Sequence, residues 1–221
     1  MPRRAPPRLA LILVAGLAAA PAAAQEDAPT LDLGVGFTSN YLFRGVTQSD
    51  DKPAVQPWAE LGWRGVYGSV SASNVDFGTR AVEIDLAAGY RFALGPVDWE
   101  LRAARFFYTD TGDCCGELVI KGYASPLERL RLGAEFHYDR GDADRYGMLA
   151  ASVSLGDGFY VSGVAGAYLE DDGDADWNLG VGRAFEGGVA ADLRVHDTTA
   201  GDLRVNATLS FATDWESLRG R

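Results

Sequence analysis

Apolar and polar residues alternate with a period of two along most of the chain. In the clearest stretch the apolar series is Val82, Ile84, Leu86, Ala88, Tyr90 and Phe92, and the series between them is Glu83, Asp85, Ala87, Gly89 and Arg91. A helix cannot keep such a series on one side, whereas the side chains of a strand point alternately to its two faces. The pattern therefore predicts strands with one apolar and one polar face.

The same alternation recurs in twelve segments. They cover residues 31–43, 54–64, 66–74, 81–92, 97–108, 117–124, 129–138, 145–155, 158–169, 177–184, 188–196 and 202–212. Many of them are close to the ~10 residues that a tilted strand needs to cross a bilayer. Pro57 falls inside the second segment and removes a ladder hydrogen bond, so we expect a bulge or a rim position there.

The connections alternate between long acidic loops and short turns. The long ones are residues 44–53, 74–80, 109–116, 139–144, 170–176 and 197–201, and the short ones are 65, 93–96, 125–128, 156–157 and 185–187. An antiparallel transmembrane β-barrel has this layout, with tight periplasmic turns at one end and longer external loops at the other. The predicted fold class is therefore all-β, as one antiparallel barrel of about 12 strands.

A soluble β-sandwich or lipocalin-like barrel is the competing interpretation, because the pattern does not say which face is outside. Three observations favour the membrane barrel. The polar faces are dense in small residues, aromatic residues recur near strand ends, and an even strand number places both termini on one side.

The first 24 residues have the layout of a secretory signal peptide. Three arginines precede an apolar run over residues 9–20, and an Ala-x-Ala site ends at Ala24. Residues 1–24 are thus predicted to be the signal peptide and residues 25–221 the barrel. Loss of the three arginines takes the net charge from −11 to −14, which argues against a nucleic-acid partner.

The polar faces carry charges of both signs. The candidate lumen-lining residues are Arg44, Glu83, Asp85, Arg91, Glu100, Arg102, Arg131, Glu135, Asp192, Arg194 and Arg204. They predict either a charge-lined channel that selects solutes or a salt-bridge network that fills a narrow lumen. The mixed signs argue against a filter for a single ion.

Two loops carry further chemistry. Cys114 and Cys115 are adjacent and flanked by glycines, and an oxidised structural pair is favoured over free thiols or a redox or copper site. The acidic run over residues 170–176 could offer oxygen ligands to Ca²⁺, but it lacks the terminal Glu of an EF-hand loop and is interpreted as solvated. We expect no cofactor and no metal site, with divalent bridging to lipopolysaccharide as a minor role for this run.

Hydrolysis of lipid is the enzyme alternative, and it needs a His beside a Ser near the outer rim. His137 and His196 both share the parity of the polar face, and the chain has no Gly-x-Ser-x-Gly elbow. The sequence therefore favours a protein that is not an enzyme.

Residues 39–56 form the most individual stretch of the chain and read SNYLFRGVTQSDDKPAVQ. The Tyr-Leu-Phe-Arg-Gly core, the Gln-Ser-Asp and the Lys-Pro-Ala-Val-Gln tail resemble the opening signature of the TorF family of proteobacterial porins. That family usually has Gly soon after the final Gln, where this chain has Pro57. The resemblance implies an outer-membrane β-barrel with a pore role.

The signature itself predicts the end of one strand, an external loop and the start of the next strand. We expect Tyr41 and Phe43 at the outer membrane interface and Arg44 in the lumen mouth, with the loop either contacting solute or plugging the barrel. The expected function is passive diffusion of small polar solutes through the outer membrane, with lipid and lipopolysaccharide as partners. The alternative is a non-conducting structural or adhesion barrel that acts through its external loops.

Overall fold

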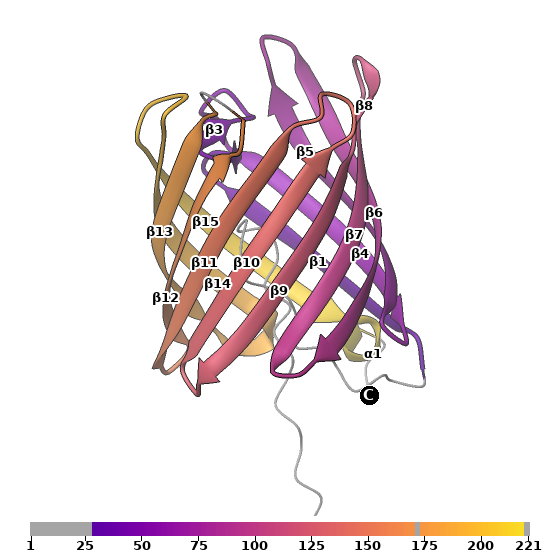
Figure 1. Cartoon of the computed structure of the whole chain (residues 1–221), viewed down its shortest axis with the longest axis vertical. Coiled ribbons are helices and arrows are strands. Elements are labelled where there is room, and N and C mark those ends of the chain that lie inside the picture. Colours follow the sequence, from indigo (N-terminus) through magenta and orange to yellow (C-terminus); the bar gives the residue numbers. More distant parts are fainter. Residues whose placement is uncertain (1–27, 171–172, 219–221) are drawn as a thin grey trace, which may run out of the picture.

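The computed structural model describes residues 28–170 and 173–218. The predicted signal peptide lies outside these residues. Twelve long strands make one sheet that closes on itself (Figure 1), and these strands are β1 (Thr30–Thr38), β4 (Ala54–Trp63), β5 (Val66–Asp76), β6 (Arg80–Leu94), β7 (Val97–Tyr108), β9 (Glu117–Leu127), β10 (Leu130–Asp139), β11 (Arg145–Gly156), β12 (Phe159–Tyr168), β13 (Ala175–Ala184), β14 (Val189–Thr198) and β15 (Arg204–Asp214).

Every neighbouring pair of these strands is antiparallel. Strand β1 pairs with β15 on one side and with β4 on the other, and β6 pairs with β7, so no strand of the cylinder has a free edge. Full closure satisfies the backbone hydrogen bonds of a sheet without water, which is the condition for crossing a bilayer with strands. The predicted twelve-stranded antiparallel barrel is confirmed.

Short turns join the strands at one end of the barrel. In the β4–β5 turn Arg64 has φ 50° and Gly65 has φ 84°, and in the β11–β12 turn Asp157 and Gly158 have φ 50° and 80°. Two consecutive residues with positive φ make the tight turn that matches the twist of a β-hairpin. The described residues also hold η1 (Glu186–Gly188) in the β13–β14 connection and α1 (Trp215–Leu218) after β15 at this same end.

Longer loops join the strands at the opposite end, which we call the outer end. Two of them carry short extra strands, namely β2 (Leu42–Phe43), β3 (Val46–Thr47) and β8 (Gly112–Cys115). Strands β2 and β3 form a small hairpin inside the Ser39–Pro53 connection. None of the helices in the described residues is long and apolar enough to span a membrane.

Pro57 lies beyond the outer end of the β4–β5 ladder, which corresponds to the rim position and not to the bulge that the sequence also allowed. It pairs with Val35 of β1, but the ladder between β4 and β5 begins only at Trp58. Beyond that point side chains replace the ladder, because the Val55 amide donates to Asn74 Oδ1 at 2.8 Å and Gln56 Nε2 donates to Ser73 Oγ at 2.9 Å. The missing N–H of proline therefore falls where the two strands have already separated.

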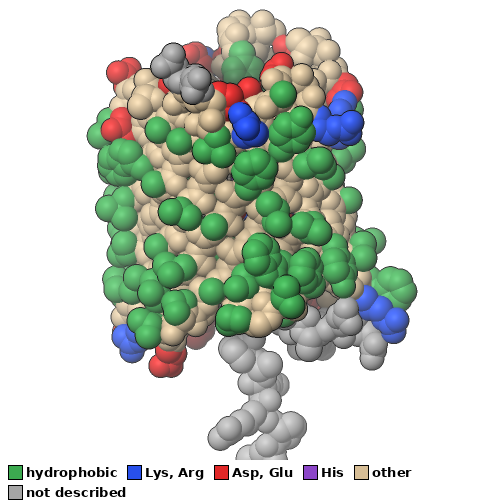
Figure 2. Space-filling view, in the orientation of Figure 1, with side chains coloured by type: hydrophobic (Ala, Val, Ile, Leu, Met, Phe, Trp, Pro, Cys, Tyr) green, Lys and Arg blue, Asp and Glu red, His purple; other side chains and the backbone are tan. Residues whose placement is uncertain are grey.

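The two faces of the barrel wall differ in chemistry. Large apolar side chains point outward and are exposed, with Leu149 at 68%, Leu179 at 54% and Leu193 at 53%. Figure 2 shows apolar side chains over the middle of the visible face and charged ones toward its two ends. A soluble sheet would bury this apolar face, so the wall has the polarity of a barrel that faces lipid.

Candidate functional site

The inner wall of the barrel carries the polar parity of every strand. The acidic residues Glu83, Glu100 and Glu135 are 5–7% exposed, Asp192 is 9% exposed and Arg194 is 4% exposed. Charged side chains are buried in proteins only when they are paired or hydrogen-bonded. The lumen is therefore a site of dense polar contacts.

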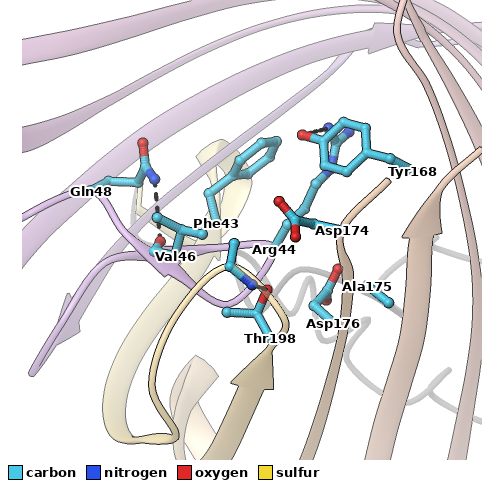
Figure 3. Close-up of a pocket in the computed structure, with 10 residues that line it drawn as sticks. Phe43, Arg44, Val46, Gln48, Tyr168, Asp174, Ala175, Asp176 and Thr198 are labelled. Carbon is cyan, nitrogen blue, oxygen red and sulfur yellow. Dashed lines mark hydrogen bonds between the residues drawn. The ribbon is translucent and has the colours of Figure 1, made fainter. Parts of the chain in front are cut away.

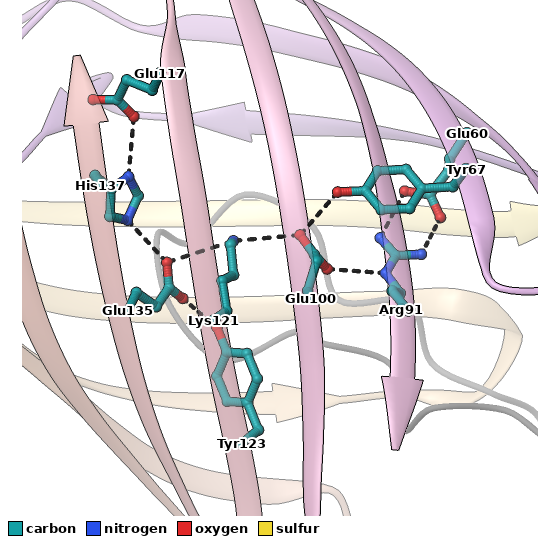
Figure 4. A network of polar contacts seen from close by, with 9 residues as sticks. All are labelled: Glu60, Tyr67, Arg91, Glu100, Glu117, Lys121, Tyr123, Glu135 and His137. Atoms are coloured by element: carbon teal, nitrogen blue, oxygen red, sulfur yellow. Dashed lines mark hydrogen bonds and ion pairs between the residues drawn. The ribbon is translucent and has the colours of Figure 1, made fainter. Parts of the chain in front are cut away.

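One side of the lumen holds a continuous chain of ion pairs (Figure 4). Arg91 lies between two glutamates, with 2.5 Å from its Nη1 to Glu60 Oε1 and 2.9 Å from its Nε to Glu100 Oε2. Lys121 then bridges Glu100 and Glu135, at 3.9 and 3.5 Å from its Nζ. Glu60 belongs to β4, and the next four residues of the chain of ion pairs belong to the adjacent strands β6, β7, β9 and β10.

The chain of ion pairs ends at a histidine near the outer end. His137 has Nδ1 at 3.0 Å from Glu117 and Nε2 at 3.1 Å from Glu135. Two tyrosines support the glutamates from the same wall, since the hydroxyl of Tyr67 donates to Glu100 at 2.9 Å and that of Tyr123 donates to Glu135. Every carboxylate of this chain thus has a cationic or hydroxyl partner.

Arg194 makes a second, separate cluster on β12, β13 and β14. Its guanidinium contacts both carboxylate oxygens of Asp192 at 3.1 Å, Asn178 Oδ1 at 2.6 Å and Ser162 Oγ at 2.7 Å. The five N–H groups of arginine suit such a fan of acceptors.

The remaining candidates lie at various heights of the lumen. Asp85 accepts a hydrogen bond from Ser71 at 3.1 Å, Arg131 lies over the ring of Tyr123 at 5.0 Å, and Arg204 Nε donates to Asp51 at 2.7 Å at the rim. Arg102 is on the inner face of β7, and its Nε has no hydrogen-bond partner among the described residues. The structure thus brings seven candidates into ion pairs, namely Arg44, Arg91, Glu100, Glu135, Asp192, Arg194 and Arg204. Glu83 accepts from the hydroxyls of Tyr41 and Tyr108, and Asp85, Arg102 and Arg131 lie outside the two main clusters.

Sequence reasoning missed several residues that complete these clusters. Glu60, Lys121, Glu117 and the inward tyrosines all share the polar parity of their strands, so the alternation itself contains the signal. The alternation does not give the register between neighbouring strands. That register places Lys121 directly beside Glu100 on one side and Glu135 on the other.

The first strand ends earlier than predicted. It stops at Thr38 instead of residue 43, and the chain then turns inward, so the expectation that Tyr41 and Phe43 lie at the membrane interface is wrong. The Tyr41 hydroxyl instead donates to Glu83 inside the barrel at 2.8 Å. The physical reason is a set of competing side-chain bonds at the strand end, where Thr38 and Asn206 hold the Asn40 carbonyl at 2.9 and 2.6 Å.

The inward hairpin places Arg44 in the mouth of the lumen (Figure 3). Its guanidinium donates to Glu117 at 2.7 Å and to the Tyr168 hydroxyl at 2.9 Å, and it lies 4.0 Å from the centre of the Tyr146 ring. These partners belong to β9, β12 and β11, whereas the hairpin connects β1 to β4.

Two cavities lie beside the hairpin at the outer end. One of about 260 Å³ is lined by Arg44, Tyr168, Asp174 and Asp176, among others. The other, of about 250 Å³, has a wall of aromatic and acidic side chains that includes Tyr41, Glu83, Tyr108, Glu117, His137, Asp139, Asp142 and Asp144. Both volumes lie just below the range of roughly 300–1,000 Å³ that is typical of small-molecule pockets.

Charges at the rim of the barrel fix the loops. The Arg204 hydrogen bond lowers the pKa of Asp51, and the Lys52 ammonium forms an ion pair with Asp76 at 2.9 Å. In the loop after β12, Glu170 accepts from Arg145 at 3.0 Å, which lowers the pKa of that carboxyl. Residues 171 and 172 of the acidic run lie outside the described residues.

The two cysteines are joined by a disulfide in β8. Because they are neighbours in the sequence, the bond closes only a small local ring and ties no distant segments together. In the part of the chain that the structure describes, His, Cys, Asp and Glu side chains form no group suited to a metal ion.

Comparison with known proteins finds one partial family match and several similar barrels. Residues 22–125, slightly under half of the chain, match a family described as bacterial protein of unknown function (Gcw_chp). This match includes the signature at residues 39–56, but its description is not that of the TorF family, so the TorF resemblance stays a prediction. No curated protein matches the chain.

Among solved structures the fold is similar to outer-membrane porins. KdgM porin in complex with disordered oligogalacturonate has a TM-score of 0.63 at 7% identity, with 82% of this chain and 98% of that chain covered. NanC porin has 0.53 at 11%, with 82% and 97% covered, and Omp33 of Acinetobacter baumannii has 0.51 at 7%, with 83% and 98% covered. At these identities the likeness establishes a porin-like barrel fold.

Proposed function

We propose that this protein is an outer-membrane porin through which small polar solutes diffuse passively. The observation that supports it best is the polarity of the wall, which is apolar and exposed outside and charged inside, with two cavities at the outer mouth. Outer-leaflet lipid and lipopolysaccharide are then the partners of the apolar face, and export by the predicted signal peptide delivers the chain to that membrane.

Strand number sets the width of the lumen. Barrels of eight strands are filled by their own side chains, whereas barrels of sixteen or more leave an aqueous channel. The twelve strands of this barrel fall between these limits. Charged groups along the inner wall, Arg102 and Arg131 among them, are the proposed lining of the solute path.

A non-conducting structural or adhesion barrel is the second candidate. It is favoured by one specific observation, namely that the Ser39–Pro53 hairpin folds across the mouth and reaches the far wall through Arg44. A lipid-modifying enzyme is the third candidate, and both His137 and His196 share the inward parity, away from lipid.

Single-channel conductance of the refolded mature chain in a planar bilayer tests the proposal. We expect discrete steps whose size or ion preference changes in Arg102→Ala and Arg131→Ala. Arg183→Ala is the control. Arg183 is exposed and points outward from β13 at the turn end, and its replacement removes the same charge. A silent bilayer from protein that shows the heat-modifiable gel shift of a folded barrel would reject the porin and leave the structural role.

A further inference from the structure

The Ser39–Pro53 hairpin spans the mouth from one wall to the other. It leaves the barrel between β1 and β4, and Arg44 at its tip contacts β9, β11 and β12. In the closed strand order these three strands are reached only by passing β5, β6 and β7 on one side or β15, β14 and β13 on the other. Arg44 therefore touches the wall farthest from its own strands.

The hairpin is held at several points. Tyr41 donates to Glu83, and the Asp76 amide of β5 donates to the Gln48 carbonyl at 2.8 Å. Gly45, with φ 78°, packs so closely on β14 that a Cβ there would lie 2.8 Å from Thr198 Cβ. These contacts with β5, β6 and β14, together with those of Arg44, give the hairpin a defined position in the mouth.

Four residues line both cavities, namely Phe43, Arg44 and Gln48 of the hairpin segment and Tyr168 of β12. The charge of Arg44 is paired with Glu117 at 2.7 Å. The other charged groups on the wall of the first cavity are Asp174 and Asp176, and those of the second are Glu83, Asp139, Asp142, Asp144 and His137. Aromatic rings of Tyr41, Phe43, Tyr108, Tyr146 and Tyr168 complete the lining, and such rings attract cations over their faces.

We propose that Arg44 is the specificity-determining residue of the pore: it divides the outer mouth into two passages that admit neutral and cationic polar solutes and disfavour anions. This inference rests on the proposed porin function. In a mouth lined by acidic residues alone, the acids would set the ion preference. Here the ion pair of Arg44 with Glu117 sets both the width of the passages and the balance of charge.

Replacement of Arg44 and replacement of Glu117 should shift the ion preference in opposite directions. Removal of Arg44 leaves His137 as the hydrogen-bond partner of Glu117 among the described residues, so the preference for cations rises and the passages merge. Removal of the Glu117 charge leaves Arg44 unneutralised between the passages, so the preference shifts toward anions. For one charge acting across a partly aqueous lumen we expect a roughly three-fold change in the permeability ratio in each case.

The test measures conductance and reversal potential in planar bilayers under a tenfold KCl gradient. The proteins are the wild type, Arg44→Ala, Glu117→Gln, the double variant Arg44→Ala/Glu117→Gln, and Arg183→Ala as the control of equal charge. Arg44→Lys serves as a second variant that keeps the charge and loses the paired fork of donors. Gradients of choline chloride and potassium gluconate extend the result from K⁺ and Cl⁻ to organic ions.

The expected result is cation preference in the wild type, a larger conductance in both Arg44→Ala proteins, and shifts of opposite sign in the two single variants. The double variant returns to near the wild-type ratio while it keeps the larger conductance, and Arg183→Ala changes neither quantity. Anion preference in the wild type, or equal conductance in wild type and Arg44→Ala, overturns the inference while steps of any kind still support the porin. Absence of steps in every folded protein rejects the porin itself, and this inference with it.

Discussion

Glycine and aromatic residues are paired across strands on the inner wall. Direct cross-strand neighbours of this kind are Gly34 with Trp58, Gly89 with Tyr67, Gly133 with Tyr123 and Gly182 with Tyr160. In each pair the ring lies where a Cβ on the glycine would stand. The glycines on the inward-facing positions therefore leave space for aromatic rings from the neighbouring strand, and these rings fill the lumen. Such pairing of an aromatic ring with a glycine stabilises glycine in strands.

Replacement of Gly133 by alanine should destabilise the barrel. The new methyl group would lie 2.6 Å from Tyr123 Cε1, and that ring is 2% exposed and bonded to Glu135, so it has little room to move. Overpacking of this kind costs about 1–3 kcal/mol. The measurement is urea unfolding in lipid vesicles, followed by tryptophan fluorescence.

Gly68→Ala is the matched control for that measurement. Gly68 is exposed, and the nearest atom to its added Cβ is the Ala87 carbonyl oxygen at 3.9 Å. It should leave stability unchanged or slightly raised, because alanine suits a strand better than glycine. Equal stability of the two variants would show that the cross-strand rings are not packed as described.

Strand positions could be predicted well from alternation, and the hairpin at the first loop could not. Period-two patterning places eleven strands close to their observed bounds, because a wall with lipid on one side and polar contacts on the other admits only that order. The same parity runs on through Tyr41 and Phe43, although Thr38 and Asn206 end the strand first. Contacts from β15 decide this bend, and residues 168 positions apart leave no local signal.

The outer end of the hairpin should loosen in acid. Asp51 is held by Arg204, whose Nε donates at 2.7 Å, and this hydrogen bond lowers the pKa of Asp51. A lowered carboxyl pKa means that the bond is present above the ordinary Asp value of about 3.9 and is lost as pH falls through the lowered value. A spin label at Val46→Cys should therefore be immobile at pH 7 and become mobile in strong acid.

Arg204→Ala controls for the other carboxyls that titrate in this range. In that variant the label should already be more mobile at pH 7, and its remaining acid response should be smaller than in the wild type. If the two proteins follow the same curve, Asp51 does not anchor the hairpin.

Charge is distributed unevenly over the whole barrel. The net charge of the chain is −11, and the long loops of the outer end carry many of its acids, whereas the outward face between the two ends is apolar. Sequence patterning alone allowed this apolar face to be inside or outside. The closed strand order and the buried glutamates decide between the two, because they show the polar parity filling the interior.

A charged substitution on the outward face should cost stability in proportion to its depth. Leu179 is 54% exposed at the centre of β13, and arginine at the midplane of a bilayer costs about 2–4 kcal/mol. Leu94 is 68% exposed at the turn end of β6, where the same change costs about 0–1 kcal/mol. We therefore expect Leu179→Arg to lower the unfolding free energy in vesicles clearly more than Leu94→Arg does. A soluble barrel predicts small effects of both substitutions, because an arginine at either exposed site would meet water. Equal small effects would therefore contradict the membrane assignment.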